Sequence, residues 1–336
     1  MEIDYFKLFT FRRFTNALKI ISSYQLSRIF RKPIVWGYPL SFSIEPTNRC
    51  NLECPECPSG LGKLTRPLGS LSFNMFKKWV DQIKNETFYL QLFFQGEPFI
   101  NKELNQMLEY ARNQKIYTSI STNGLLLNDK NIDLVLQNPP DKLIFSIDGL
   151  DEQTYRNYRV GGSFKIADES LKNLLIKKRN QNLSKPFVEL QFIVMKQNEH
   201  QINDLKKYAR ELGIDKLTLK TMQVSSYQNA INFLPKNKKY SRYTIENSSV
   251  KLKKKLANRC FAIWRTSVLT WDGNIVPCCF DKDANHKLGN INEQHFKEIW
   301  KNKNYYNFRK AILKNRKAIP ICTNCTEGLS LNLLDN

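Results

Sequence analysis

Three cysteines lie within eight positions of the chain, in the segment CNLECPEC at residues 50–57. Their spacing is C-x3-C-x2-C, and the whole chain of 336 residues contains only eight cysteines. Three thiols cannot all pair in disulfides, and a structural zinc site needs a fourth protein ligand, for which no histidine is near in sequence. Iron–sulfur clusters are held by thiolates. Cys50, Cys54 and Cys57 therefore favour a cluster that keeps one iron open to a small molecule.

A second cysteine set lies towards the C-terminus and consists of Cys260, Cys278, Cys279, Cys322 and Cys325. Residues 267–277 predict a β-hairpin with an Asp-Gly turn, which brings the first two cysteines of this set together. A C-x2-C pair then follows a helical stretch at 289–317. Four thiolates suit either a structural zinc or a four-iron cluster with every iron ligated. Cys279 is the spare thiol, which either substitutes for Cys278 or packs as a small apolar residue.

Six short runs of apolar, β-branched or aromatic residues predict strands. They are residues 40–44, 89–94, 117–121, 142–147, 188–194 and 216–220. Amphipathic stretches lie between them. In one of these, Phe76, Val80 and Ile83 recur three to four apart on one helix face, and Ser72 is expected as its N-cap. The alternation predicts an α/β fold whose parallel sheet is curled as an open or closed barrel.

A polar turn follows each of the first four predicted strands. The cysteine loop follows the first, QGEP (95–98) the second, TNG (122–124) the third and DG (148–149) the fourth. In β/α barrels, the loops at the carboxyl ends of the strands build the active site. Asn-Gly and Asp-Gly are also ordinary loop formers. Four such turns at equivalent positions, one of them a cysteine cluster, predict convergence on a single mouth.

These motifs, in this order, resemble the radical S-adenosylmethionine (SAM) superfamily over residues 40–220. The resemblance implies a partial (β/α)6 TIM-like barrel in which Cys50, Cys54 and Cys57 hold a catalytic 4Fe–4S cluster. It implies that SAM binds the open iron and is reductively cleaved to a 5′-deoxyadenosyl radical, which abstracts hydrogen from a substrate. A flavodoxin- or ferredoxin-type protein would supply the electron.

The resemblance also implies a set of SAM contacts. Gly96, Glu97 and Pro98 correspond to the turn that meets the methionine ammonium, with Glu97 as a charge-assisted acceptor. The later strands would contribute Ser121, Asn123, Ser146, Asp148 and Arg159. Of these, Ser121 and Asn123 match polar groups beside SAM, while Ser146 and Asp148 match groups that reach the ribose hydroxyls. Arg159 is a candidate for the SAM carboxylate, or else an ordinary surface cation.

The C-terminal cysteines, spaced C-x12-G-x4-C with a late C-x2-C, resemble the auxiliary-cluster extension called SPASM, in its shortened twitch form. A full SPASM domain has cysteines for a second auxiliary cluster, which this sequence does not contain. The resemblance implies one auxiliary 4Fe–4S cluster ligated by Cys260, Cys278, Cys322 and Cys325, with zinc as the alternative. A fully ligated cluster implies electron transfer.

The composition is strongly basic, with 52 Lys and Arg against 31 Asp and Glu and a net charge of +21. The basic residues concentrate in 236–259 and 297–317, which predicts either affinity for polyanions or a solvated surface. The 41% hydrophobic content excludes a disordered chain. No apolar run is long enough to span a membrane, and clustered unpaired cysteines without a secretory segment indicate a reducing cytosol.

Residues 1–36 predict one or two basic amphipathic helices, in which Phe14, Leu18 and Ile21 align on one side. Such a helix either packs against the barrel or lies at a membrane interface. The sequence leaves both options open.

The sequence predicts four parts, which are a basic helical extension (1–36), a radical SAM barrel (38–222), a basic connector (223–257) and a SPASM/twitch domain (258–328). We expect a cytoplasmic radical SAM enzyme of oxidoreductase type, acting on a peptide, a sugar or glycan, or another anionic small molecule. Contact with the inner membrane face through residues 1–36 is a further option.

Two alternatives remain at this point. One is a membrane-surface radical SAM enzyme acting on lipid or glycan. The other is a non-enzymatic, metal-stabilised nucleic-acid-binding protein, although no recognition helix or aromatic RNA-binding pattern favours a nucleic-acid partner.

Overall fold

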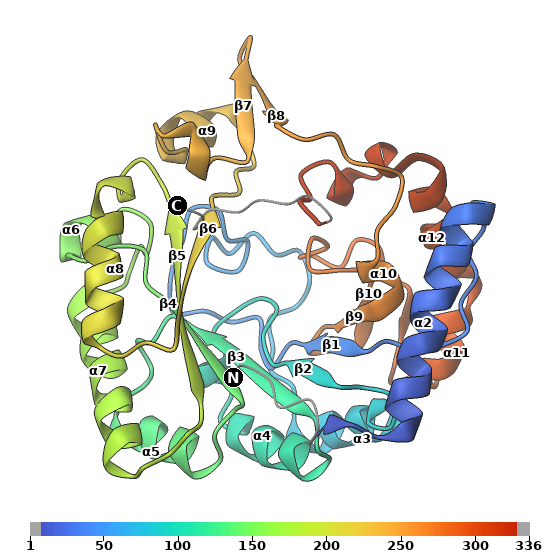
Figure 1. Ribbon diagram of the computed structural model, residues 1–336, viewed down its shortest axis with the longest axis horizontal. Helices are drawn as coiled ribbons and strands as arrows, with labels where there is room; N and C mark the ends of the chain where they lie inside the picture. The colour runs from blue at the N-terminus through green and yellow to red at the C-terminus, as the bar shows by residue number, and fades with distance from the viewer. Residues whose placement is uncertain (1–7, 328–336) are drawn as a thin grey trace. The chain divides into compact units, whose positions relative to one another are not determined.

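The computed structural model describes residues 8–327 of the chain, which fall into two compact units (Figure 1). The first unit comprises residues 8–49, 64–119 and 256–327, and the second comprises residues 50–63 and 120–255. The chain crosses between them on either side of the cysteine loop and again within strand β3 (Tyr117–Thr122). Each unit therefore has contributions from distant parts of the sequence.

The first unit combines the early strands of the barrel with the C-terminal hairpin. Its helices are α2 (Phe11–Phe30), α3 (Phe73–Ile83), η1 (Pro98–Ile100), α4 (Leu104–Asn113), α10 (Ala262–Arg265), α11 (Phe296–Lys301), α12 (Lys303–Asn315), η4 (Arg316–Ala318) and η5 (Pro320–Cys322). Its further strands are β1 (Ser41–Ile44), β2 (Tyr89–Gln91), β9 (Thr266–Leu269), β10 (Asn274–Val276) and β11 (Gly289–Asn290). The strand order is β11-β10-β9-β1-β2-β3, in which β9, β1, β2 and β3 run parallel.

The C-terminal hairpin is an extension of the barrel sheet. Its strand β9 pairs in parallel with β1, in a register that places Ile44 opposite Leu269, and β10 returns antiparallel to β9. The turn holds Gly273 at φ +88°, where a Cβ would lie 2.5 Å from the side-chain amide nitrogen of Asn292. The predicted hairpin is thus confirmed, and its attachment to β1 is a contact that the local sequence pattern did not indicate.

The second unit contains the later βα repeats. Its strands are β4 (Lys142–Ser146), β5 (Phe187–Val194), β6 (Lys216–Thr221), β7 (Tyr243–Glu246) and β8 (Ser249–Leu252). Its helices are α5 (Asp129–Gln137), α6 (Glu152–Arg156), α7 (Phe164–Asn180), η2 (Glu199–Gln201), α8 (Ile202–Glu211), α9 (Tyr227–Phe233) and η3 (Lys238–Tyr240). Strands β4, β5 and β6 are parallel neighbours, and β7 and β8 form a separate hairpin. The predicted α/β fold with a mostly parallel sheet is confirmed, and part of the predicted basic connector is regular structure.

Local sequence signals explain several element boundaries. The hydroxyl of Ser72 accepts a hydrogen bond from the Met75 amide at 3.3 Å, so α3 begins at the predicted N-cap. The predicted strand 89–94 ends early, at Gln91. The Leu92 amide still donates to the Ser119 carbonyl at 2.8 Å, after which the chain turns towards Gly96.

Helix α2 packs against the first unit, but through its polar side rather than the apolar side on which Phe14 and Leu18 lie. The buried Arg13 guanidinium donates to the carbonyls of Lys115 at 2.6 Å and Lys84 at 3.0 Å. Asn16 exchanges two hydrogen bonds with the Tyr38 backbone, at 2.9 and 2.8 Å. These polar groups satisfy backbone groups that would otherwise be buried without partners, which stabilises the inverted orientation.

Candidate active site and auxiliary cysteine site

The cysteine loop of the second unit is tightly wound. The Cys57 amide donates to the Cys54 carbonyl at 3.0 Å, and the Leu61 amide donates to the Cys57 carbonyl at 3.0 Å. Gly60 packs so closely that a Cβ on it would lie 2.8 Å from the Cys54 amide nitrogen. None of the three thiols forms a disulfide within residues 8–327, and Cys54 is buried while Cys50 and Cys57 are half-buried. The donor set is therefore three reduced thiols on one compact loop, which fits a thiolate-held cluster.

An apolar cluster surrounds this loop within the second unit. Its buried members include Leu52, Cys54, Tyr158, Met195, Met222, Val224 and Phe233. Cys50, Cys57 and Ile193 pack against the same cluster. Because the apolar surroundings of a metal site control solvent access and the local dielectric, this environment is suited to tuning a redox centre.

One buried cation lies beside the loop. Arg159 donates from Nε to Asp148 Oδ2 at 2.7 Å, and the same oxygen lies 2.6 Å from a terminal nitrogen of Arg159. Burial raises the pKa of the Cys54 thiol, and the neighbouring Arg159 charge counteracts that rise. A fixed positive charge thus favours the thiolate that a metal ligand requires.

The reading of Arg159 as an ordinary surface cation is wrong, since its side chain is only 14% exposed. Its partner Asp148 is fully buried, and its other carboxylate oxygen accepts a hydrogen bond from the Ile193 amide at 2.6 Å. Both oxygens of Asp148, which the sequence assigned to the ribose, are therefore engaged by protein groups.

The other predicted contacts of the second unit lie at the ends of β3 and β4. Asn123 donates from its side chain to Asn51 Oδ1 at 2.9 Å, so the turn after β3 is tied to the cysteine loop. The turn after β4 reaches the same loop through Asp148 and Arg159. Ser121 and Ser146 are half-buried, and within residues 8–327 neither hydroxyl has a hydrogen-bond partner. Three of the four predicted turns therefore meet in this unit.

The fourth turn, Gly96-Glu97-Pro98, belongs to the first unit and is built against the end of β1. Gly96 has φ +75°, and a Cβ there would lie 2.6 Å from the carbonyl oxygens of both Thr47 and Arg49. The Glu97 amide donates to the Arg49 carbonyl at 2.8 Å, and Glu97 Oε1 accepts from the Phe99 amide at 3.2 Å. The turn is thus fixed to the residue that immediately precedes Cys50, with a glycine where no side chain fits.

The C-terminal cysteines come together in the first unit from three separate segments. Burial raises the pKa of the Cys278 thiol well above its usual value, and the nearby Cys260 and Cys325 thiols add to the rise. Cys322 and Cys325 are buried, and the Cys325 amide donates to the Cys322 carbonyl at 3.1 Å. Cys279 is exposed, unlike the other four thiols of this set. This is the residue that the sequence left as the spare.

Cys325 has a cation of its own. A terminal nitrogen of the buried Arg316 lies 3.2 Å from Cys325 Sγ, and a second one donates to the Arg259 carbonyl at 2.8 Å. The Glu327 amide lies 3.3 Å from the same sulfur. Hydrogen bonds to thiolate sulfurs are one way in which proteins tune clusters.

Within residues 8–327, no three Cys, His, Asp or Glu side chains stand close enough together to hold a single metal ion. The cluster ligands are therefore assigned from donor chemistry. Each set consists of cysteines that form no disulfide within residues 8–327 and that lie beside a buried arginine.

A cavity of about 720 Å³ borders the auxiliary cysteines within the first unit. Ser41 and Ser43 of β1 and the first and last residues of β2, Tyr89 and Gln91, line it together with Cys278 and Cys279. Because alternate residues of a strand point to the same face, the cavity lies along one face of these strands.

Two family models match this chain. The model described as the radical SAM superfamily matches residues 44–209, and the model described as an iron–sulfur cluster-binding domain, SPASM, matches residues 260–326. The chain belongs to the radical SAM superfamily and carries a SPASM domain. It is thus an enzyme that uses SAM and iron–sulfur clusters, and a non-enzymatic nucleic-acid-binding protein is no longer an alternative.

Two curated relatives illustrate the range of the family. The tungsten-containing aldehyde ferredoxin oxidoreductase cofactor-modifying protein of Pyrococcus furiosus is 26% identical over 84% of this chain and 86% of its own length. The antilisterial bacteriocin subtilosin biosynthesis protein AlbA of Bacillus subtilis is 25% identical over 78% of this chain. The chain spans only 59% of AlbA.

A solved structure supports the fold. Streptococcus suis SuiB bound to SAM superposes with a TM-score of 0.63 at 16% identity, over 88% of this chain and 72% of SuiB. The partial TIM-like barrel of the radical SAM core is thereby confirmed as the fold. Among the described helices of this chain, none is both long and apolar enough to cross a bilayer.

Three functional neighbours were missed by sequence reasoning, namely Asn51, Arg316 and the Asp148 partnership of Arg159. Asn51 lies inside the cysteine motif at a position where any residue fits the pattern. Arg316 belongs to a basic run that reads as solvated surface, yet only 2% of it is exposed. No local signal distinguishes such a buried arginine, because its partners Cys325 and the Arg259 carbonyl lie 9 and 57 residues away in the chain.

Proposed function

We propose that this radical SAM enzyme modifies a peptide substrate. Support comes from the relatives, since AlbA is named for bacteriocin biosynthesis and SuiB has been solved with its precursor peptide SuiA bound. The observation that carries the radical chemistry itself is the loop of three cysteines without a disulfide, beside a buried Arg159. When bound, the four-iron cluster and SAM supply a 5′-deoxyadenosyl radical that removes hydrogen from the substrate.

We infer the following roles for the residues around SAM. Cys50, Cys54 and Cys57 hold the catalytic cluster, and the Gly96 turn brings Glu97 to the methionine ammonium. The half-buried hydroxyls of Ser121 and Ser146 are suited to donate to SAM, because they have no other hydrogen-bond partner within the described chain. Arg159 would bind the SAM carboxylate or the cluster sulfurs, and Asp148 would fix its orientation.

Cys260, Cys278, Cys322 and Cys325 would hold the auxiliary cluster in the SPASM domain. Because all of its irons would then be ligated, its role would be electron transfer rather than substrate binding. The 720 Å³ cavity beside Cys278 would give a reductant or substrate group access to it. The electron would come from a flavodoxin- or ferredoxin-type protein. We also propose that the chain is divided into a radical SAM barrel (38–222), a connector (223–257) and a SPASM domain (258–328).

The test is an anaerobic assay of the reconstituted enzyme with dithionite, SAM and a synthetic peptide. The peptides to test are short ones encoded by genes that neighbour the gene of this enzyme. We expect 5′-deoxyadenosine to accumulate and the peptide mass to fall by about two hydrogens, or to change by another fixed increment. SAM cleavage with an unmodified peptide would contradict the peptide proposal and leave the family chemistry standing. An oligosaccharide or nucleotide sugar tested in parallel covers the glycan alternative.

A further inference from the structure

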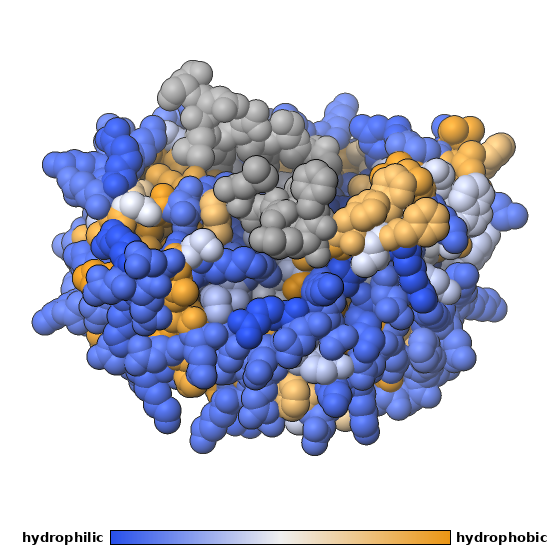
Figure 2. Space-filling model, turned by 60° about the horizontal axis from the view of Figure 1, so that its bottom comes forward, coloured by the Kyte–Doolittle hydropathy of each residue, from blue (hydrophilic) through white to orange (hydrophobic). Residues whose placement is uncertain are grey.

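Helix α2 presents an apolar face to solvent. Phe11, Phe14, Leu18 and Ile21 are 78%, 44%, 49% and 46% exposed, and Ile29 is 71% exposed. At about 100° per residue, these positions fall on one stripe opposite the buried side that carries Arg13, Ile20 and Ser27. Figure 2 shows hydrophobic side chains gathered on the right of the visible face, the side on which α2 lies in Figure 1. The helix is therefore anchored by polar groups, and within residues 8–327 its apolar stripe stays exposed apart from a ring contact between Phe14 and Phe9.

Cations flank this stripe, and within residues 8–327 only Arg12 among them has a carboxylate partner, Glu86 at 2.6 Å. Arg12 and Lys19 lie along one edge of the helix, Arg28 along the other, and all three are exposed. No Asp or Glu occurs between residues 8 and 44. An amphipathic helix of this kind, with large apolar residues between cationic edges, has the composition of helices that lie in the interface of an anionic membrane.

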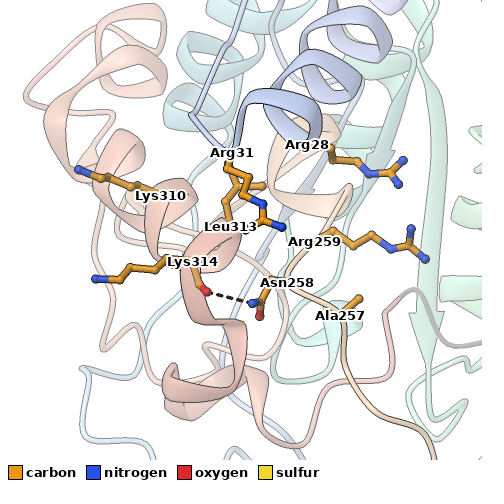
Figure 3. A pocket seen from close by; sticks show the side chains of 8 residues that line it. All are labelled: Arg28, Arg31, Ala257, Asn258, Arg259, Lys310, Leu313 and Lys314. Carbon is orange, nitrogen blue, oxygen red and sulfur yellow. Dashed lines mark hydrogen bonds between the residues drawn. The ribbon is translucent and has the colours of Figure 1, made fainter.

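A cationic pocket continues the same surface at the end of α2 (Figure 3). It has a volume of about 490 Å³, and Arg28 and Arg31 of α2 line it together with Arg259 and with Lys310 and Lys314 of α12. Five cations thus share one pocket that no acidic side chain lines. Within residues 8–327, none of the five forms an ion pair with a carboxylate.

Hydrogen bonds between the Asn258 side chain and backbone groups fix the walls of this pocket. Asn258 donates from its side chain to the Lys314 carbonyl at 2.9 Å, and its Oδ1 accepts from the Arg316 amide at 3.0 Å. Asn258 therefore joins the segment that leads to Cys260 to the end of α12. In Figure 3 the amino groups of Lys310 and Lys314 point to one side and the guanidinium groups of Arg28 and Arg259 to the other, with Arg31 between them. Positive charges on both sides of the pocket without compensation attract an anion to this surface.

We propose that this face of the first unit binds the surface of a membrane that contains anionic lipids. Helix α2 lies in the headgroup region with its apolar stripe towards the acyl chains, and the cationic pocket receives a lipid phosphate. Two copies of the chain are not favoured as partners for each other, because their cations would meet. Nucleic acid is disfavoured because three of the five stripe residues, Leu18, Ile21 and Ile29, are aliphatic and cannot stack on bases.

The inference is independent of the radical chemistry, and its consequence is that the enzyme works at a bilayer surface. Each cation near an anionic membrane tightens binding by about fivefold, and salt screens this contribution. The apolar stripe adds affinity that salt does not remove. Binding to vesicles is thus expected to have a salt-sensitive part and a salt-resistant part.

The experiment is flotation of the full-length holoenzyme with vesicles of phosphatidylcholine, with or without about one third phosphatidylglycerol. We expect the enzyme to float with the anionic vesicles and largely not with the neutral ones. Lys310→Gln/Lys314→Gln is expected to weaken binding by about 25-fold, since two cations are removed. Leu18→Gln/Ile29→Gln is expected to abolish the salt-resistant part.

Matched controls test whether the effect belongs to this face. Ile166→Gln/Ile176→Gln changes two apolar residues of α7 that are exposed to a similar extent, 48% and 46%, and Lys102→Gln/Lys130→Gln removes two exposed lysines elsewhere. Neither control should change flotation. Iron content, the circular dichroism spectrum and SAM cleavage should stay at wild-type values in every variant, so failure here is distinguishable from failure of the radical chemistry.

Three results would overturn the inference. They are the absence of flotation with anionic vesicles, an equal loss of binding in the controls, and a concentration-dependent dimer in solution that the α2 substitutions dissociate. Retention by an RNA column that the α2 substitutions leave unchanged, without flotation, would assign the cationic pocket to nucleic acid instead.

Discussion

The two cysteine sets of this enzyme have similar surroundings but are assembled from the sequence in different ways. The catalytic trio is contained in eight consecutive residues, whereas the auxiliary ligands are spread over the 66 positions from Cys260 to Cys325. Each set nevertheless has one buried arginine at a sulfur, Arg159 beside Cys54 and Arg316 beside Cys325. The difference lies in what holds the arginine, because Asp148 neutralises Arg159 while backbone carbonyls hold Arg316.

This contrast separates local from tertiary construction. The trio depends on loop geometry that a short motif can encode, and only its arginine is brought from a later segment, between α6 and α7. The auxiliary site does not exist until the hairpin, helix α12 and the C-terminal turn are folded together. We therefore expect the two sites to respond differently to single substitutions.

The largest effect is expected from removing one ligand from each set. Cys54→Ala should abolish SAM cleavage and lower the iron content from about eight to about four atoms per chain, since each cluster holds four irons. Cys260→Ala should remove a similar amount of iron, yet leave reductive SAM cleavage measurable while product formation is lost. Iron analysis and 5′-deoxyadenosine assays would show this. If Cys260→Ala also ended SAM cleavage, the two sites would not be independent.

The next largest effect is expected at the two arginines. Arg159→Gln leaves the Asp148 carboxylate buried without its partner, which costs about 3–5 kcal/mol of stability. Arg316→Gln removes hydrogen bonds but strands no buried carboxylate, so a loss of about 1–3 kcal/mol is expected. Chemical denaturation of the metal-free proteins measures both values.

A double substitution sharpens this prediction. Asp148→Asn/Arg159→Gln should recover most of the stability, because no buried charge remains unpaired. The reduction potential of the catalytic cluster should nevertheless stay lower than in the wild type, since the lost Arg159 charge acts on Cys54 more strongly than the lost Asp148 charge and Arg159 also donates a hydrogen bond to it. Redox titration followed by electron paramagnetic resonance measures it, and an unchanged potential would show that Arg159 has only a structural role.

Sequence reasoning predicted the local parts of this molecule and missed the tertiary ones. The strands, the Ser72 cap and the 272–273 turn are confirmed because each depends on residues a few positions apart. The outward orientation of α2 was not predicted. Amphipathicity identifies the apolar side of a helix, but whether that side is buried depends on partners such as the Lys115 carbonyl, about 100 residues away.

The same limit applies to the site. The cysteine spacing and the Gly-Glu-Pro turn could be recognised in the sequence, as could the candidate residues Ser121 and Asn123. The engagement of both Asp148 oxygens could not, because it requires Arg159 and the Ile193 amide to arrive from two different elements. Buried pairs of this kind leave no periodic pattern.

A smaller loss of stability than at Arg159 is expected at Gly96, the glycine of the SAM turn. Gly96→Ala places a methyl group 2.6 Å from two carbonyl oxygens at φ +75°, so we expect a stability loss of about 3 kcal/mol and at least tenfold weaker SAM binding. Gly62→Ala is the matched control, with φ +62° but no atom within 4 Å of the added carbon. It should cost about 1–2 kcal/mol and leave SAM binding intact. Equal effects at both positions would mean that backbone strain, and not the close contact at Thr47 and Arg49, is decisive.

The smallest effect is expected at Cys279, where the comparison between neighbouring thiols is the most direct. Cys278 is half-buried and interacts with Cys260 and Cys325, whereas the adjacent Cys279 is exposed, although its thiol also interacts with Cys325. Cys278→Ser should therefore lose the auxiliary iron, and Cys279→Ser should keep the iron content and product formation within experimental error of the wild type. If the two substitutions gave equal iron loss, Cys279 would be a ligand and the position assigned to Cys278 would be shared. If neither lost iron, each thiol would be able to replace the other, as two adjacent donors on one turn could do by a small backbone rotation.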